Sequence, residues 1–207
     1  SRIDAAWISL KEGDGDRLWH YAARAIDRVI PGFSKTMLPF LGGDGGAASP
    51  KRVIPQLIQE LTPRSEPFLL VLDDVHHVAD PAVYDSLRFI LENMPAPMHL
   101  VLIGRHAPPL PLARLRMLGE LNEIGIQDLR FSPEETALLI EKSLRRTFPS
   151  AAAELLCAKT EGWAAGIKIA AVHLRDEEHS EQWIRNFSGA HPHVADFVAE
   201  ELLAQQP

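Results

Sequence analysis

Two adjacent aspartates stand at the end of an apolar run in the segment FLLVLDDVHHV, residues 68–78. The run before them, residues 68–72, has the length and β-branched content of a strand that is covered on both faces of a sheet. Carboxylates at such a strand end can hold Mg²⁺, because magnesium prefers hard oxygen ligands and keeps several of its waters. Asp73 and Asp74 are therefore candidates for a metal-assisted reaction. The alternative is that they only cap the following turn.

An apolar strand that ends in Asp-Asp has the Walker B pattern of P-loop nucleoside triphosphatases. In that pattern the first acid, here Asp73, holds Mg²⁺ directly or through water, and the second, here Asp74, polarises the attacking water. A second apolar run, HLVLIGR, ends in Arg105. Its guanidinium could sense a γ-phosphate at the same edge of the sheet. The alternative for Arg105 is an ion pair with a surface carboxylate.

The phosphate loop that these residues would require, G-x-x-x-x-G-K-[ST], does not occur in the sequence. GGDGGAASPKR has the glycines, but Lys51 follows Pro50, which has no backbone N–H to bind a phosphate. PGFSKT has Ser34 in place of the second glycine and follows a predicted helix, so it is interpreted as a helix-ending turn. A phosphate loop would precede AAWISL, and we expect the sequence to begin just after it.

Two histidines follow the aspartates and could be read, with Asp73, as metal ligands. No other ligand spacing supports zinc, so the favoured interpretation of His76 and His77 is a solvent-facing turn. The single cysteine, Cys157, lies in the apolar pattern AAELLCA and is expected to be a small buried hydrophobe.

Strands and helices alternate along the first part of the chain, which predicts a mainly parallel sheet. A helix is expected from about Arg17, with Asp16 as its N-cap. The other predicted helices of this part are 50–61 and 81–93, and the predicted strands are AAWISL, 68–72, HLVLIGR and EIGIQDLRF (123–131).

No strand is predicted after Phe131. Ser132 and Glu135 have the spacing of a capping box, and Pro133 stands at the first helical position. Further helices are expected at 150–160, 163–174 and 193–203. A domain boundary is therefore placed near Phe131.

The bulk composition is that of a globular protein. The chain has 207 residues, 46% of them apolar, and a formal net charge of -7. An acidic chain without a concentrated basic patch argues against direct DNA contact. No apolar run reaches the roughly 20 residues of a transmembrane helix, and the N-terminus lacks a signal-peptide layout, so a cytoplasmic location and no membrane partner are expected.

Four segments, taken in order, resemble the signal-transduction ATPases with numerous domains (STAND class), and within them LuxR-family transcriptional activators of the maltose-regulon (MalT) type. These segments are WISLKEGDGDRLWHYAARAI, LLVLDDVHHVADPAVYDSLRFILENMP, LVLIGRHAPPLPLARLRMLGELNEI with DLRFSPEETALLI, and TEGWAAGIKIAA. They cover nearly the whole chain in a familiar spacing. The chain departs from the family at Gly104, where serine or threonine often precedes the arginine, and at Ala164, where proline commonly follows Gly-Trp.

The resemblance implies an ATP-binding switch. ADP would hold a closed resting form, whereas inducer and ATP would favour an open form that self-associates and activates transcription through a C-terminal helix-turn-helix. ATP or ADP with Mg²⁺ would be the cofactors of the intact protein, and this part alone is expected to bind none. Inducer and DNA would bind to domains that this sequence does not contain.

By position in the family motifs, Asp73 and Asp74 would be the catalytic acids, with Asp73 directing the metal. Arg105 would be the sensor of the nucleotide, and Arg114, Arg116 and Trp163 would be further nucleotide-binding residues.

The expected fold is α/β, namely an incomplete P-loop NTPase sheet without its first strand and phosphate loop, followed by an all-α lid domain. The expected domains are a truncated nucleotide-binding domain (1–131), the lid (132–190) and the start of a winged-helix domain (191–207). The predicted function is an ATP-dependent regulatory module of a LuxR-family activator, without hydrolysis by this part alone. The alternative is a non-catalytic interaction or scaffold domain.

Overall fold

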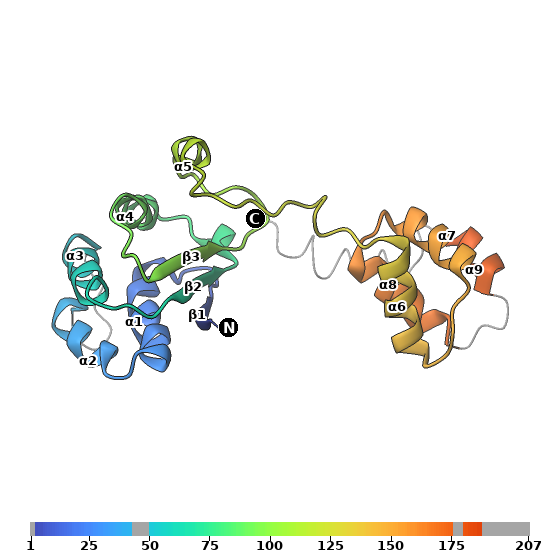
Figure 1. The fold of residues 1–207 in the computed structure, drawn as a ribbon, viewed down its shortest axis with the longest axis horizontal. Coiled ribbons are helices and arrows are strands. Elements are labelled where there is room, and N and C mark those ends of the chain that lie inside the picture. Colours follow the sequence, from blue (N-terminus) through green and yellow to red (C-terminus); the bar gives the residue numbers. More distant parts are fainter. Residues whose placement is uncertain (1–2, 43–49, 176–179, 188–207) are drawn as a thin grey trace. The chain divides into compact units, whose positions relative to one another are not determined.

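The computed structural model describes residues 3–42, 50–175 and 180–187. The chain divides into two compact units, residues 1–121 and residues 122–207. Strands occur in the first unit, whereas the regular elements in the described part of the second unit are all helices (Figure 1). The division places the segment 122–131 with the helical unit, although the sequence pattern assigns it to the first domain. The expected winged-helix start (191–207) and most of the glycine-rich segment 41–50 lie outside the described residues.

The sheet of the first unit has three parallel strands in the order β1-β2-β3, which confirms the mixed α/β class and the parallel sheet. The strands are β1 (Asp4–Ser9), β2 (Phe68–Asp73) and β3 (Met98–Leu102). Ser9 stands opposite Asp73, and Leu72 stands opposite Leu102. The carboxyl ends of all three strands therefore meet at one edge of the sheet.

The helices that connect successive strands lie on one side of the sheet (Figure 1). Right-handed connections require this arrangement when each new strand is added at the same edge of the sheet. Between β1 and β2 lie α1 (Leu18–Val29), α2 (Phe33–Met37) and α3 (Pro50–Leu61). Between β2 and β3 lies α4 (Pro81–Glu92), whose N-cap Asp80 accepts a hydrogen bond from the N–H of Ala82. The predicted helices at 50–61 and 81–93 are thereby confirmed to within one residue.

One face of the sheet supplies the core of this unit. Alternate strand residues such as Ala6, Leu70 and Met98 join a single cluster with the buried faces of α1, α3 and α4. The opposite face contributes no residue to that cluster in the described part of the chain. Trp7 on that face is 52% exposed, and Val71, although buried, lies outside the cluster. The expectation of a strand buried on both faces thus holds at Val71 of the central strand β2, whereas Trp7 of the edge strand β1 is exposed.

The predicted strand at 123–131 is absent, and this segment forms turns and irregular chain. The Asp128 carboxylate accepts a hydrogen bond from the N–H of Gly125, and the N–H of Asp128 bonds back to the carbonyl of Gly125. Such local bonding competes with strand pairing. Ile124 and Ile126 are 74% and 72% exposed, so their alternating pattern buries neither side chain here.

The predicted N-cap at Asp16 is also wrong. A 3-10 turn, Gly15–Arg17, precedes α1, and Arg17 is the residue before the first turn of the helix. Asp14 bonds instead, accepting the N–H of Lys11 at 2.8 Å. The predicted turn at the end of α1 is confirmed, because Gly32 adopts a left-handed conformation there, and α2 begins immediately after it.

The second unit packs α6 (Pro133–Leu144), α7 (Ser150–Thr160), α8 (Ala164–His173) and α9 (Ser180–Asn186) around its own core, which includes Ile140, Leu156 and Ile167. The capping box is confirmed, since the Ser132 hydroxyl accepts the N–H of Glu135 and the Glu135 carboxylate accepts the N–H of Ser132.

A close backbone contact joins the start of α6 to the turn after α7. Gly162 has a φ of +69°, and a Cβ at this position would lie 2.6 Å from the Phe131 carbonyl oxygen. The Cys157 thiol donates to the same carbonyl at 3.3 Å. Cys157 is thus partly exposed and hydrogen-bonded, unlike the buried hydrophobe expected.

Candidate functional site

The candidate site lies where the chain leaves β2 and β3 at the carboxyl edge of the sheet. Hydrogen bonds extend the pairing of the two strands past their ends, from the N–H of Ile103 to the carbonyl of Leu72 and from the N–H of Val75 to the carbonyl of Ile103. The two segments that follow, DVHH and GRH, are therefore held against each other. This edge is the usual ligand-binding position of an open parallel sheet.

Asp73 ends β2 and is partly buried. Its Oδ1 accepts the N–H of Asp74 at 3.0 Å, and its carbonyl accepts the N–H of Leu10 on the neighbouring strand. One carboxylate oxygen of Asp73 is thus engaged by the backbone at the start of the turn, although the N-cap of η3 is Asp74, which has no side-chain cap bond. A carboxylate has two oxygens, so the bond that Asp73 accepts is compatible with a metal-directing role for the other.

Asp74 adopts the left-handed conformation, with a φ of +59° and a ψ of +37°. Aspartate tolerates this conformation better than most residues with a side chain. The reversal turns the chain into the 3-10 segment η3 (Val75–His77), and it leaves the Asp74 side chain 50% exposed. Asp74 Oδ1 lies 3.8 Å from Nδ1 of His76.

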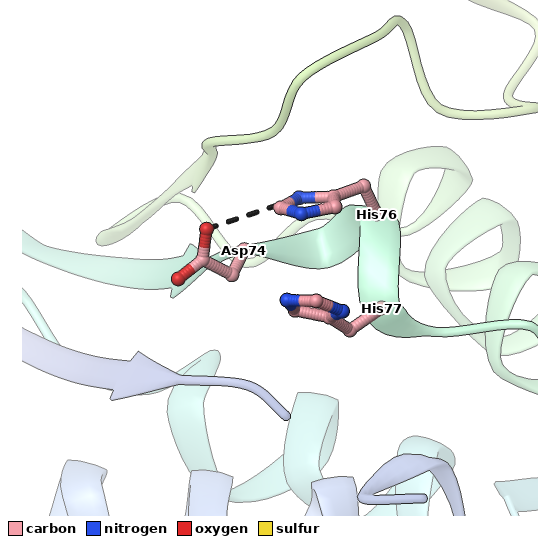
Figure 2. Close-up of side chains that lie close together, drawn as sticks. All are labelled: Asp74, His76 and His77. Carbon is pink, nitrogen blue, oxygen red and sulfur yellow. Dashed lines mark ion pairs between the residues drawn. The ribbon is translucent and has the colours of Figure 1, made fainter. Parts of the chain in front are cut away.

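His76 as a whole residue is intermediate in exposure, but its imidazole is largely buried, which corrects the expectation of a solvent-facing turn. Its side chain is 8% exposed, and both ring nitrogens are inaccessible without a hydrogen-bond partner. The ring lies beside His77, with centroids 4.2 Å apart, and beside His106, with centroids 6.2 Å apart. Figure 2 shows the two neighbouring imidazoles next to the Asp74 carboxylate.

Burial lowers the pKa of His76 below its ordinary value. The charges of His77, Arg105 and His106 lower the pKa further, while the Asp74 carboxylate opposes them. The burial effect dominates because a charged imidazole loses its hydration in the turn. His76 is therefore a neutral imidazole at neutral pH.

The η3 turn is fixed from two sides. The Tyr84 hydroxyl, on α4, lies 3.2 Å from the carbonyl oxygen of Val75 and 3.0 Å from that of Val78. On the other side a Cβ on Gly104 would lie 3.0 Å from a Val75 methyl group. Gly104 thus leaves the space that the Val75 side chain and the His76 backbone occupy at this edge.

The predicted nucleotide-binding residues come from different elements of the two units. Arg105 is exposed at this edge, and its charge acts on His76. Arg114 and Arg116 are exposed on α5 (Leu112–Leu118), a helix without buried residues. Trp163 precedes α8 in the other unit and is 38% exposed. The structure therefore brings together Asp73, Asp74 and Arg105.

Sequence reasoning weighed His76 and His77 as metal ligands with Asp73 and favoured a solvent-facing turn, but it did not group them with Asp74 and His106. The signal was available, because histidines follow the ends of two strands that a parallel sheet would place side by side. An open groove elsewhere, beside β1, includes neither aspartate, and polar residues such as Lys11, Asp14 and Arg24 line it together with Trp7 and Tyr21.

No protein-family model matches the chain. The functional interpretation therefore rests on the residues at the carboxyl edge and on their geometry. Separately, no helix among the described residues is long and apolar enough to cross a membrane.

Proposed function

We propose that the chain is an ATP-dependent regulatory module of a LuxR-type transcriptional activator, in which the nucleotide state controls self-association. The observation that carries this proposal is the meeting of Asp73, Asp74 and Arg105 at the carboxyl edge of a parallel sheet, after neighbouring strands β2 and β3. An acid pair and a guanidinium at this edge have the arrangement that phosphoryl transfer uses.

In this proposal each residue acts through its position. The Asp73 oxygen that the backbone does not engage would hold a water of Mg²⁺, because magnesium retains most of its water ligands. Asp74 would orient the attacking water, and Arg105 would neutralise charge on the terminal phosphate. Arg114, Arg116 and Trp163 would bind nucleotide only in a state that brings them to the same edge.

The residues at this edge are better suited to hold the Mg²⁺ ion that accompanies a nucleotide than to bind the phosphates of the nucleotide. The sequence has no glycine-rich loop whose N–H groups could surround the phosphates. We therefore expect the 207-residue chain by itself to bind ATP weakly or not at all and to show no hydrolysis. Saturable, Mg²⁺-dependent binding of ATP in the micromolar range would contradict this expectation.

The test of the function uses the complete gene product. Asp73→Asn keeps an oxygen that can accept the N–H of Asp74, so the turn survives while the charge is lost. We expect at least tenfold weaker Mg²⁺-dependent ATP binding and a loss of activated transcription. Asp85→Asn, which removes an exposed carboxylate paired with Arg88 on α4, is the matched control and should change neither.

The second candidate is a non-catalytic interaction module, and the backbone bond of the Asp73 side chain favours it. In that case Asp73→Asn would leave nucleotide response and transcription unchanged, because asparagine preserves that bond. Unchanged transcription in this variant, together with an intact fold, would replace the ATP switch by the scaffold function.

A further inference from the structure

Three potential metal ligands converge beside the η3 turn, namely Asp74, His76 and His77. One ligand atom from each lies within 4.8 Å of those of the other two. Figure 2 shows the two imidazole rings next to each other, with the Asp74 carboxylate beside them. Asp73, the residue proposed to direct Mg²⁺, is not a member of this group.

The burial of His76 points to a ligand. Its side chain is more than nine-tenths buried, and neither ring nitrogen has a hydrogen-bond partner. A buried polar group without a partner costs about 1–3 kcal/mol, so such groups are usually satisfied by protein, water or metal. A metal ion bound to one ring nitrogen would satisfy that atom directly.

The donor set selects the class of metal. Two imidazoles and one carboxylate suit Zn²⁺ and its neighbours in the first transition row, whereas Mg²⁺ and Ca²⁺ prefer oxygen ligands throughout. Three protein ligands leave one tetrahedral position for water.

The geometry needs only a small adjustment. Donor atoms around a tetrahedral Zn²⁺ lie about 3.3 Å apart, as follows from Zn–N bonds of about 2.0–2.1 Å. His76 is held by the fixed turn, while His77 is only partly buried and Asp74 is half exposed. Closing the site on an ion would therefore call for movement of those two side chains and not of the turn.

We propose that Asp74, His76 and His77 form a binding site for one divalent transition-metal ion, with Zn²⁺ as the best match. The site does not rest on the proposed nucleotide function, because its ligands are argued from their own geometry, but it shares Asp74 with that function. It also gives Asp74 a second role, because an ion bound there would occupy the carboxylate that the ATP switch would need.

The test is a Zn²⁺ titration of the 207-residue chain without a histidine tag. Binding is measured by calorimetry and by competition with a chromophoric chelator. We expect one Zn²⁺ per chain. His76→Gln, His77→Gln and Asp74→Asn should each weaken binding by at least about tenfold, because loss of even an outer-shell partner costs about 10–100-fold. His99→Gln, an exposed residue near the opposite end of β3, should bind as the parent does.

Two further measurements exclude trivial explanations. His77→Gln alters a partly exposed side chain, so it tests the site even if the His76→Gln variant does not fold. Circular dichroism shows whether each variant is folded. Cys157→Ser should leave Zn²⁺ affinity unchanged. Absence of saturable binding would overturn the proposal. So would an affinity that is lost in Cys157→Ser but unchanged in His77→Gln and Asp74→Asn.

Discussion

The imidazole of His76 lies in an environment that disfavours its protonation. Because the folded state lowers its pKa, the unfolded chain binds more protons below the ordinary pKa of about 6.5. Stability should therefore decrease as the pH falls from about 7 through this range, and no such penalty exists at higher pH.

The corresponding prediction concerns the slope of stability against pH. In the presence of a chelator, His76→Gln should lose less free energy of unfolding between pH 7 and pH 5 than the parent chain does. Urea unfolding at several pH values measures this slope. His99→Gln serves as the control and should keep the parent slope. An equal slope for His76→Gln and the parent would show that His76 is not buried as described.

Gly104 gives a second prediction at the residue scale. Gly104→Ala would place a methyl group 3.0 Å from a Val75 side-chain carbon, so Val75 or the η3 turn must shift. Overpacking of this kind typically costs about 1–3 kcal/mol. Thermal unfolding should show this loss, and Zn²⁺ affinity should fall although no ligand is changed. Gly125→Ala is the control, since the nearest atom there is an Asp128 carboxylate oxygen at 3.7 Å, an ordinary contact distance.

Among the elements, the link between α4 and the η3 turn depends on one hydroxyl group. Tyr84→Phe removes the donor that reaches the carbonyls of Val75 and Val78. We expect a loss of about 0.5–1.5 kcal/mol, the usual net value of one hydrogen bond. Tyr21→Phe is the matched control, because its hydroxyl makes only a 3.4 Å contact with Asp14. Equal stability losses in the two variants would contradict the fixed turn.

The capping box of α6 allows a prediction for the second unit. Ser132→Ala removes the side-chain acceptor for the N–H of Glu135 and should cost about 1 kcal/mol. Ser150→Ala, at the first position of α7, removes no cap, since Pro149 precedes that helix. Chemical denaturation of both variants separates the cap from the general effect of replacing serine.

At the scale of the whole molecule, the two units have separate cores, one around the sheet and one among α6 to α9. Leu57 and Ile167 are fully buried in the first and second core, respectively. Leu57→Ala and Ile167→Ala should each cost about 2–5 kcal/mol in the unit that contains it. Hydrogen exchange resolved by segment should show faster exchange in that unit alone. Faster exchange in both units would indicate one cooperative core.

The sequence by itself determined the features that depend on local chemistry and periodicity. The helices at 50–61 and 150–160, the capping box at Ser132 and the parallel order of strands all follow from apolar spacing, caps and alternation. It also placed Asp73, Asp74 and Arg105 at one edge, because the carboxyl ends of parallel strands meet there.

The tertiary structure decided the features that depend on neighbours. A strand needs a partner for its backbone groups, and EIGIQDLRF forms a local Gly125–Asp128 turn instead of pairing. Whether a sheet face or a histidine is covered depends on which elements pack there. Trp7 is therefore exposed on the edge strand β1, while His76 lies in a turn that Tyr84 and Gly104 hold from elsewhere in the chain.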